Sequence, residues 1–226
     1  MISLVMLSWE RIDNIIYNIN QYSTYKLIDE IIVFNNNNKH TLRNIENSKL
    51  TLIESSKDLG LYSRFAAAGL ARNECIMHCD DDLFIPELTI NKLYEYWSKY
   101  PALCHGTQGR LIINDYNQNE VFGEVQIALT RCLLVSRTNC LSAFKFSLCF
   151  EDLCGVPKGN GEDIMLSFIA MHNSGKLNRS YNLPYLDYFE KDNEDHLHVA
   201  ICKRWNQHIE HRTKIVRRCK DLLGIN

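Results

Sequence analysis

Three adjacent carboxylates, Asp80-Asp81-Asp82, directly follow the apolar segment 75–79. Charges of one sign at this spacing repel one another, and a divalent cation such as Mg²⁺ or Mn²⁺ would relieve the repulsion. If the segment is extended, Asp80 and Asp82 point the same way, so one could bind the cation while the other meets a ribose or a metal-bound water. The triad predicts a divalent cation site, against the alternative of a solvated acidic turn.

A second acidic pair, Glu162-Asp163, follows Asn160-Gly161 and precedes apolar residues at helical spacing. The positive end of a helix dipole favours carboxylates at this place without any catalytic role. Taken together with the triad, the pair predicts a second group of charges for the same reaction.

The triad needs an element that holds it at the edge of a sheet. The chain alternates predicted strands and helices, at 2–7, 28–34, 50–53 and 75–79 for the strands and 12–19, 61–72 and 86–100 for the helices. This alternation implies an α/β fold with a mostly parallel sheet and helices on both faces. Ligands of such sheets bind beyond the carboxyl ends of the strands, where the triad follows its strand.

The second half of the chain has a less regular pattern between residues 102 and 135, where 111–113 and 121–122 are predicted as strands of unknown pairing. A helix is predicted from Glu162, and a closing helix over 199–223. With 226 residues and 46% hydrophobic content, we expect a single domain over 1–226.

The order of these motifs resembles the GT-A glycosyltransferases, in particular the exostosin C-terminal domain and the virus-encoded glycosyltransferases of large algal DNA viruses. Asp58-Leu59-Gly60-Leu61-Tyr62-Ser63-Arg64-Phe65 is similar to the exostosin Leu-x-x-Arg-Phe segment. Asn160-Gly161-Glu162-Asp163-Ile164 is similar to its Asn-Cys-Glu-Asp-Ile helix start. The similarity extends from residue 1 to about residue 175. It implies a nucleotide-binding half, 1–100, and an acceptor-binding half, 101–226.

The resemblance implies a donor site built on the triad. Asp82, with Asp80, would bind the Mn²⁺ or Mg²⁺ that bridges the diphosphate of a nucleotide-diphosphate sugar, favoured to be a UDP-sugar. Asp80 and Asp81 would contact the nucleoside end and the sugar. Arg64 would pair with the diphosphate, a role that suits a planar and permanently charged guanidinium.

For the reaction itself, the resemblance places Asp163 beside the reacting sugar with Glu162 in support. The acceptor would be a hydroxyl of a glycan or another molecule. A carboxylate there either deprotonates the acceptor, as an inverting enzyme needs, or steadies positive charge on the sugar carbon. The exostosin-like comparison implies retention of configuration.

The resemblance also implies roles for four further residues. Ser8 and Arg11, after the first strand, and Asn35, after the second, are assigned to the nucleotide. His198, near His196, is a candidate metal ligand, with a solvated loop as the alternative. The basic residues from Lys203 to Lys220, Arg212 among them, could close over phosphate, although such charges more often form the wet face of a terminal helix.

Composition narrows the partners and the compartment. A net charge of −2 gives no reason to expect nucleic-acid binding, and no apolar stretch approaches the length of a transmembrane segment. The nine cysteines form no Cys-x-x-Cys pair, which predicts free, mostly buried thiols in a cytoplasmic protein. Gly161 replaces the exostosin cysteine, so no disulfide forms there. The Asn- and Ile-rich composition hints at a viral source and hence the host cytoplasm.

Two other functions compete with glycosyl transfer. A sugar-phosphate nucleotidyltransferase would need a glycine-rich loop after the first strand, and residues 7–11 contain no glycine. A catalytically silent domain that binds a nucleotide or carbohydrate would share the scaffold. The presence of Asp82, Arg64 and Asp163 argues against loss of catalysis, because unpaired buried charges are unfavourable without a ligand.

Overall fold

The computed structural model describes residues 1–113, 115–150, 152–153, 160–187 and 207–225. An eight-stranded sheet in the order β3-β2-β1-β4-β10-β6-β11-β8 runs through it. Its parallel half contains the predicted strands, β1 (Ile2–Ser8), β2 (Ile28–Asn35), β3 (Leu50–Glu54) and β4 (Cys75–Cys79). Since β1 lies between β2 and β4, the carboxyl ends of these strands meet at one edge.

The other half of the sheet is mixed. Strand β10 (Cys132–Ser136) runs antiparallel to β4, and the rest of this half contains β6 (His105–Gly106), β8 (Gly123–Val125) and β11 (Asn178–Ser180). Two small sheets complete the fold, one of β5 (Leu83–Phe84) and β12 (Leu186–Asp187), the other of β7 (Gly109–Arg110) and β9 (Ile127–Ala128).

Helices cover both faces of the sheet because its strands are apolar on both sides. One buried cluster joins the sheet to α1 (Ile12–Tyr22) and α3 (Glu87–Lys99). The opposite cluster joins it to α2 (Ser63–Gly69), α4 (Arg137–Ser147) and α5 (Glu162–Ser174). The expected α/β class with a mostly parallel sheet is confirmed.

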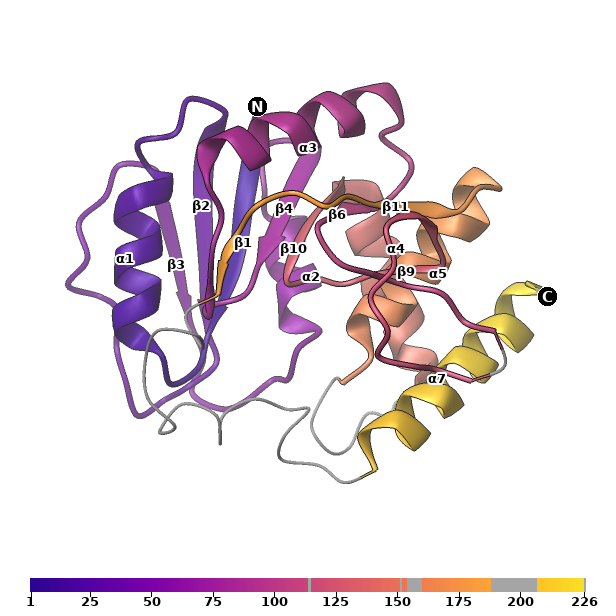
Figure 1. Cartoon of the computed structure of the whole chain (residues 1–226). Helices are drawn as coiled ribbons and strands as arrows, with labels where there is room; N and C mark the ends of the chain where they lie inside the picture. The colour runs from indigo at the N-terminus through magenta and orange to yellow at the C-terminus, as the bar shows by residue number, and fades with distance from the viewer. Residues whose placement is uncertain (114, 151, 154–159, 188–206, 226) are drawn as a thin grey trace.

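The last helix, α7 (His208–Leu223), packs against α5. It is yellow in Figure 1 and lies on the opposite side of the molecule from α1. Its apolar side chains Ile215, Val216 and Cys219 form a third buried cluster with α5, Tyr116 and Phe150, a residue of the short 3-10 helix η1 (Leu148–Phe150). This contact brings α7 to the start of α5.

Several predicted elements are wrong or shorter than expected. Residues 111–113 and 121–122 are not strands. Strand β7 ends just before the first of these segments, and β8 begins just after the second. Helix α2 spans seven residues rather than 61–72. Strand β10 and α4 were not predicted, because β10 is buried on both faces without alternation and α4 exposes Leu141 and Phe144.

The cysteines and the helices bear on two further expectations. In the described part of the chain seven cysteines are free and six of those are buried, as expected for thiols that pack as small hydrophobic groups. Among the described residues, no helix has the length and apolar character needed to cross a membrane.

Candidate active site

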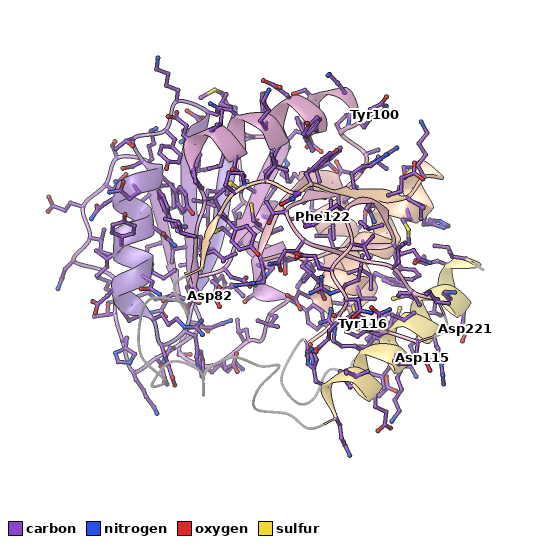
Figure 2. All side chains as sticks on the ribbon, in the orientation of Figure 1. Asp82, Tyr100, Asp115, Tyr116, Phe122 and Asp221 are labelled. Atoms are coloured by element: carbon purple, nitrogen blue, oxygen red, sulfur yellow. The ribbon has the colours of Figure 1, made fainter. Side chains whose placement is uncertain are left out.

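The acidic triad lies where β4 ends. Asp81 and Asp82 form a turn from β4 into β5, not the extended segment expected. The backbone N–H of Asp80 donates to the carbonyl of Arg131, 3.0 Å away, which ties the turn to the residue before β10. Figure 2 shows Asp82 near the lower ends of the parallel strands. The triad therefore lies at the predicted sheet edge.

Arg11 comes from the segment after β1 and neutralises the middle of the triad. Its Nη1 lies 2.6 Å from Asp81 Oδ1 and 3.6 Å from Asp82 Oδ2, with both side chains buried. Burial raises the pKa of Asp81 to about 6 although Arg11 opposes this, and repulsion from Asp80 adds to the rise. Arg11, assigned to the nucleotide from sequence, contacts the acidic turn in this structure.

Arg64 connects the triad to the second acidic pair. From α2, its Nη2 lies 2.9 Å from Asp80 Oδ1 and 3.9 Å from Glu162 Oε1, and its Nη1 donates to the Thr130 carbonyl over 3.3 Å. The two acidic motifs, far apart in sequence, thus share one guanidinium. A buried arginine so placed could also receive a diphosphate.

Asp82 has the features expected of a cation ligand. Its Oδ1 is buried and has no hydrogen-bond partner among the described residues; the guanidinium of Arg131 lies 3.5 Å away. Burial, followed by repulsion from Asp80, raises the pKa of Asp82 to about 7. A divalent cation would relieve both effects, so the residues present fit such an ion.

The protein by itself offers an incomplete coordination shell. In the described ranges no three His, Cys, Asp or Glu side chains converge as a metal-binding group. Magnesium-type sites commonly use one or two carboxylates and complete the shell with substrate phosphates and water. The arrangement around Asp82 corresponds to that type, and Asp80 is turned toward Arg64.

Glu162 and Asp163 lie in the first turn of α5, and both are buried. Thr130 donates its hydroxyl to Glu162 Oε1 over 3.0 Å. Arg212 Nη2 lies 2.6 Å from Asp163 Oδ2, and Arg212 Nη1 donates to Asn160 Oδ1 over 3.2 Å. The predicted pair is therefore close to the triad, through Arg64, and is held from the other side by α7.

Arg212 belongs to the basic run that was predicted either to close over phosphate or, as is more common, to form the wet face of a terminal helix. It is buried, and its guanidinium lies over the Tyr116 ring, 4.4 Å from the ring centroid. Figure 2 shows Tyr116 close to α7. Arg212 shares the buried face of α7 with Ile215, Val216 and Cys219, and that helical spacing was the signal that could have identified it.

The remaining predicted residues have different surroundings. Ser8 is the register partner of Asn35 at the ends of β1 and β2, and its buried Oγ has no hydrogen-bond partner among the described residues. Asn35 uses its side chain on the following loop: Nδ2 donates to the His40 carbonyl and Oδ1 accepts from the Asn37 N–H. His198 and its neighbour His196 lie outside the described residues.

A family model for the glycosyl transferase family 64 domain matches residues 2–226. The chain belongs to this family. The match confirms the expected kinship with glycosyltransferases and extends to the last residue, beyond the limit of about 175 set by the motifs. It also disfavours the nucleotidyltransferase alternative.

Relatives agree on fold and class. Glucosamine inositolphosphorylceramide transferase 1 of Arabidopsis thaliana is 25% identical over 95% of this chain, which spans only 29% of that protein. The crystal structure of S. aureus TarS 1-349 has a TM-score of 0.57 at 15% identity and covers 81% of this chain and 59% of its own. The complex of TarS 1-349 with UDP-GlcNAc has a TM-score of 0.55 at 13% identity, over 85% of this chain and 61% of its own. The TarS structures share the GT-A fold.

Gly161 is predicted to be sensitive to a single added carbon. Its φ of 99° is left-handed, and a Cβ there would overlap the Ile215 side chain of α7. Gly161→Ala should therefore lower the free energy of unfolding by about 1–3 kcal/mol. The melting temperature should fall by roughly 2–4 °C for each kcal/mol.

A matched control separates backbone strain from overlap in that experiment. Gly175 has a φ of 66° and open space around its Cβ position, so Gly175→Ala reports strain alone. We expect Gly161→Ala to be the more destabilising, and Ile215→Ala to be less harmful in its background than in the wild type. Equal losses for the two glycine variants would show that α7 is not packed this closely.

The ionisation of Glu162 should make stability depend on pH. Burial, with repulsion from Asp163, raises the pKa of Glu162 to about 7. Because the folded pKa lies above the unfolded one, the associated stability is present at low pH and is lost as pH rises toward 7. Glu162→Gln should gain on the order of 2 kcal/mol relative to wild type between about pH 5 and about pH 8. Denaturant melts at both pH values measure this, and a pH-independent difference would contradict it.

Proposed function

We propose that this chain transfers a sugar from a UDP-sugar to an acceptor hydroxyl, with Mn²⁺ or Mg²⁺ and with retention of configuration. The observation that carries the proposal is the gathering of five carboxylates and four arginines at the carboxyl edge of the sheet. The carboxylates are Asp80, Asp81, Asp82, Glu162 and Asp163, and the arginines are Arg11, Arg64, Arg131 and Arg212. Such a cluster suits a ligand that carries a diphosphate and a cation together.

The cation would be held at Asp82, with the donor phosphates completing its shell. When bound, it supplies positive charge where the leaving diphosphate gains negative charge. Arg64 is buried within reach of both acidic motifs and would contact the diphosphate as it departs. Charges fixed before the reaction stabilise the transition state more than the ground state.

Two comparisons favour UDP and a glucosamine-type sugar for the first assays. One relative is named a glucosamine inositolphosphorylceramide transferase, and one structural neighbour is a complex with UDP-GlcNAc. The ends of β1 and β2, with Ser8 and Asn35, would receive the nucleoside. Residues 101–226, which supply Arg131, Asp163 and Arg212, would face the sugar and the acceptor.

Retention is supported by the surroundings of Asp163. Its Oδ2 is engaged by Arg212 at 2.6 Å, which disfavours its taking up the acceptor proton. In the proposed reaction the bond from the anomeric carbon to the diphosphate breaks, and the acceptor oxygen attacks from the same face. The acceptor proton passes to the leaving phosphate, and Asp163 steadies the positive charge of the sugar.

The first test is a thermal-shift screen of the protein against UDP, GDP, CMP and TDP, each with Mn²⁺ or with EDTA. A ligand that binds the native state raises its melting temperature. We expect a metal-dependent shift with UDP, followed by turnover of UDP-GlcNAc. NMR should then show that the product has the same anomeric configuration as the donor. Metal-dependent UDP binding without turnover on any acceptor would favour the catalytically silent alternative, and no shift at all would contradict the proposal.

A further inference from the structure

Arg131 is a cationic side chain at the metal-binding end of the triad that no sequence motif identified. It lies in the turn before β10, and its backbone carbonyl accepts from the Asp80 N–H. Its Nη2 lies 3.5 Å from Asp82 Oδ1, the buried oxygen that has no hydrogen-bond partner among the described residues. Arg131 therefore faces the same oxygen that a divalent cation would need.

A side-chain relay from a different segment positions this guanidinium. Arg131 Nη1 lies 3.5 Å from Gln108 Oε1, and Gln108 Nε2 donates to the Tyr185 hydroxyl over 2.6 Å. Tyr185 directly precedes β12, whose Leu186–Asp187 pairs with β5 next to Asp82. Arg131 is thus aimed at Asp82 by contacts that come from both sides of the triad.

We propose that Arg131 stands in for the divalent cation at Asp82 and competes with it until the donor diphosphate attracts the guanidinium away. This inference rests on the proposed function. A guanidinium and a divalent ion cannot both approach the same buried carboxylate oxygen. Phosphate oxygens offer Arg131 a better partner, because guanidinium and phosphate form two parallel hydrogen bonds.

Among the four arginines of the site, Arg131 is the most exposed. Its side chain is 25% exposed, against 8% for Arg11, 5% for Arg64 and 6% for Arg212. The contact of Arg131 with Asp82 is 3.5 Å, long for an ion pair. A long contact and partial exposure favour release of the guanidinium from Asp82.

The consequence is coupling between metal and donor. If the donor removes a competitor of the metal, UDP must strengthen Mn²⁺ binding, and Mn²⁺ must strengthen UDP binding by the same factor. The chain would then bind free Mn²⁺ weakly and load it together with the donor.

The experiment measures Mn²⁺ affinity from the EPR signal of free Mn²⁺, with and without saturating UDP, for wild type, Arg131→Gln and Arg131→Lys. Arg131→Gln should bind Mn²⁺ alone about fivefold more tightly, the order of a partly exposed ion pair. The factor by which UDP increases the Mn²⁺ affinity of this variant should be smaller than in wild type by a similar amount. Arg131→Lys, which keeps a competing cation, should remain close to wild type. Thermal melts confirm that each variant is folded.

A control variant and two contrary outcomes separate the role of Arg131 from the proposed function. Arg179→Gln removes the same charge from an exposed ion pair with Glu124, three strands away from β4, and should leave Mn²⁺ affinity unchanged. Equal Mn²⁺ affinities of wild type and Arg131→Gln, with UDP-linked binding intact in both, would overturn the role of Arg131 alone. A wild-type protein that binds Mn²⁺ neither with nor without UDP would contradict the proposed function itself.

Discussion

Asp163→Asn is expected to lower kcat by about 10²–10⁴ while leaving UDP affinity within a small factor of wild type. The substitution keeps the shape of the side chain and an oxygen that can accept from the Ile164 N–H, as Asp163 Oδ1 does over 2.9 Å. What it removes is the negative charge that the proposed reaction places beside the sugar. Steady-state kinetics and calorimetric UDP titration measure the two effects separately.

Folding must be followed in the same experiment, because Arg212 would lose its buried counter-charge. Breaking one half of a buried ion pair can destabilise a protein by about 3–5 kcal/mol. The control is Asp115→Asn, which breaks the exposed pair between Asp115 and Arg217 of α7, 2.6 Å apart, and should change neither kcat nor stability appreciably. Near-normal turnover of a folded Asp163→Asn protein would remove Asp163 from the reaction.

Asp82→Asn is expected to weaken metal-dependent UDP binding by about 100-fold or more, since even outer partners of metal ligands contribute about 10- to 100-fold. The change preserves size but removes the charge of the buried Oδ1. Calorimetric titration of UDP with Mn²⁺ and with EDTA isolates the metal-dependent part. We expect the affinity in EDTA to change little.

Asp221→Asn provides the matched control, because Asp221 is an exposed carboxylate near the end of α7 (Figure 2). It should retain the full effect of Mn²⁺ on UDP binding. If Asp82→Asn also retained it, the cation would have to be held elsewhere, and the assignment of the triad would be wrong.

The strands of the parallel half of the sheet could be predicted because each is specified by the pattern of neighbouring residues in the sequence. Each strand there is a short buried run followed by a polar loop, and the triad follows the last run directly. Strand β10 is different: its Cys132 pairs with Cys79, a partner distant in sequence, and no local pattern specifies such a contact. The same limit applies to the pairing of β6, β11 and β8.

The acidic part of the candidate site could be predicted for the same reason. Carboxylates cluster in the sequence, so both acidic motifs were found, and the structure brings them together through Arg64. The compensating cations do not cluster. Arg131 and Arg212 are single residues, one in an irregular stretch and one inside a basic run, and only the tertiary fold turns them toward Asp82 and Asp163.

The contact between Arg212 and Asp163 also bears on the order in which a working molecule is made. The chain is synthesised from its N-terminus, so the residues of the parallel half of the sheet leave the ribosome before those of α7. Until α7 docks, Asp163 lacks the guanidinium that its buried position requires. Catalytic competence should therefore appear only after α7 has docked, later than the synthesis of the strands that precede the acidic triad.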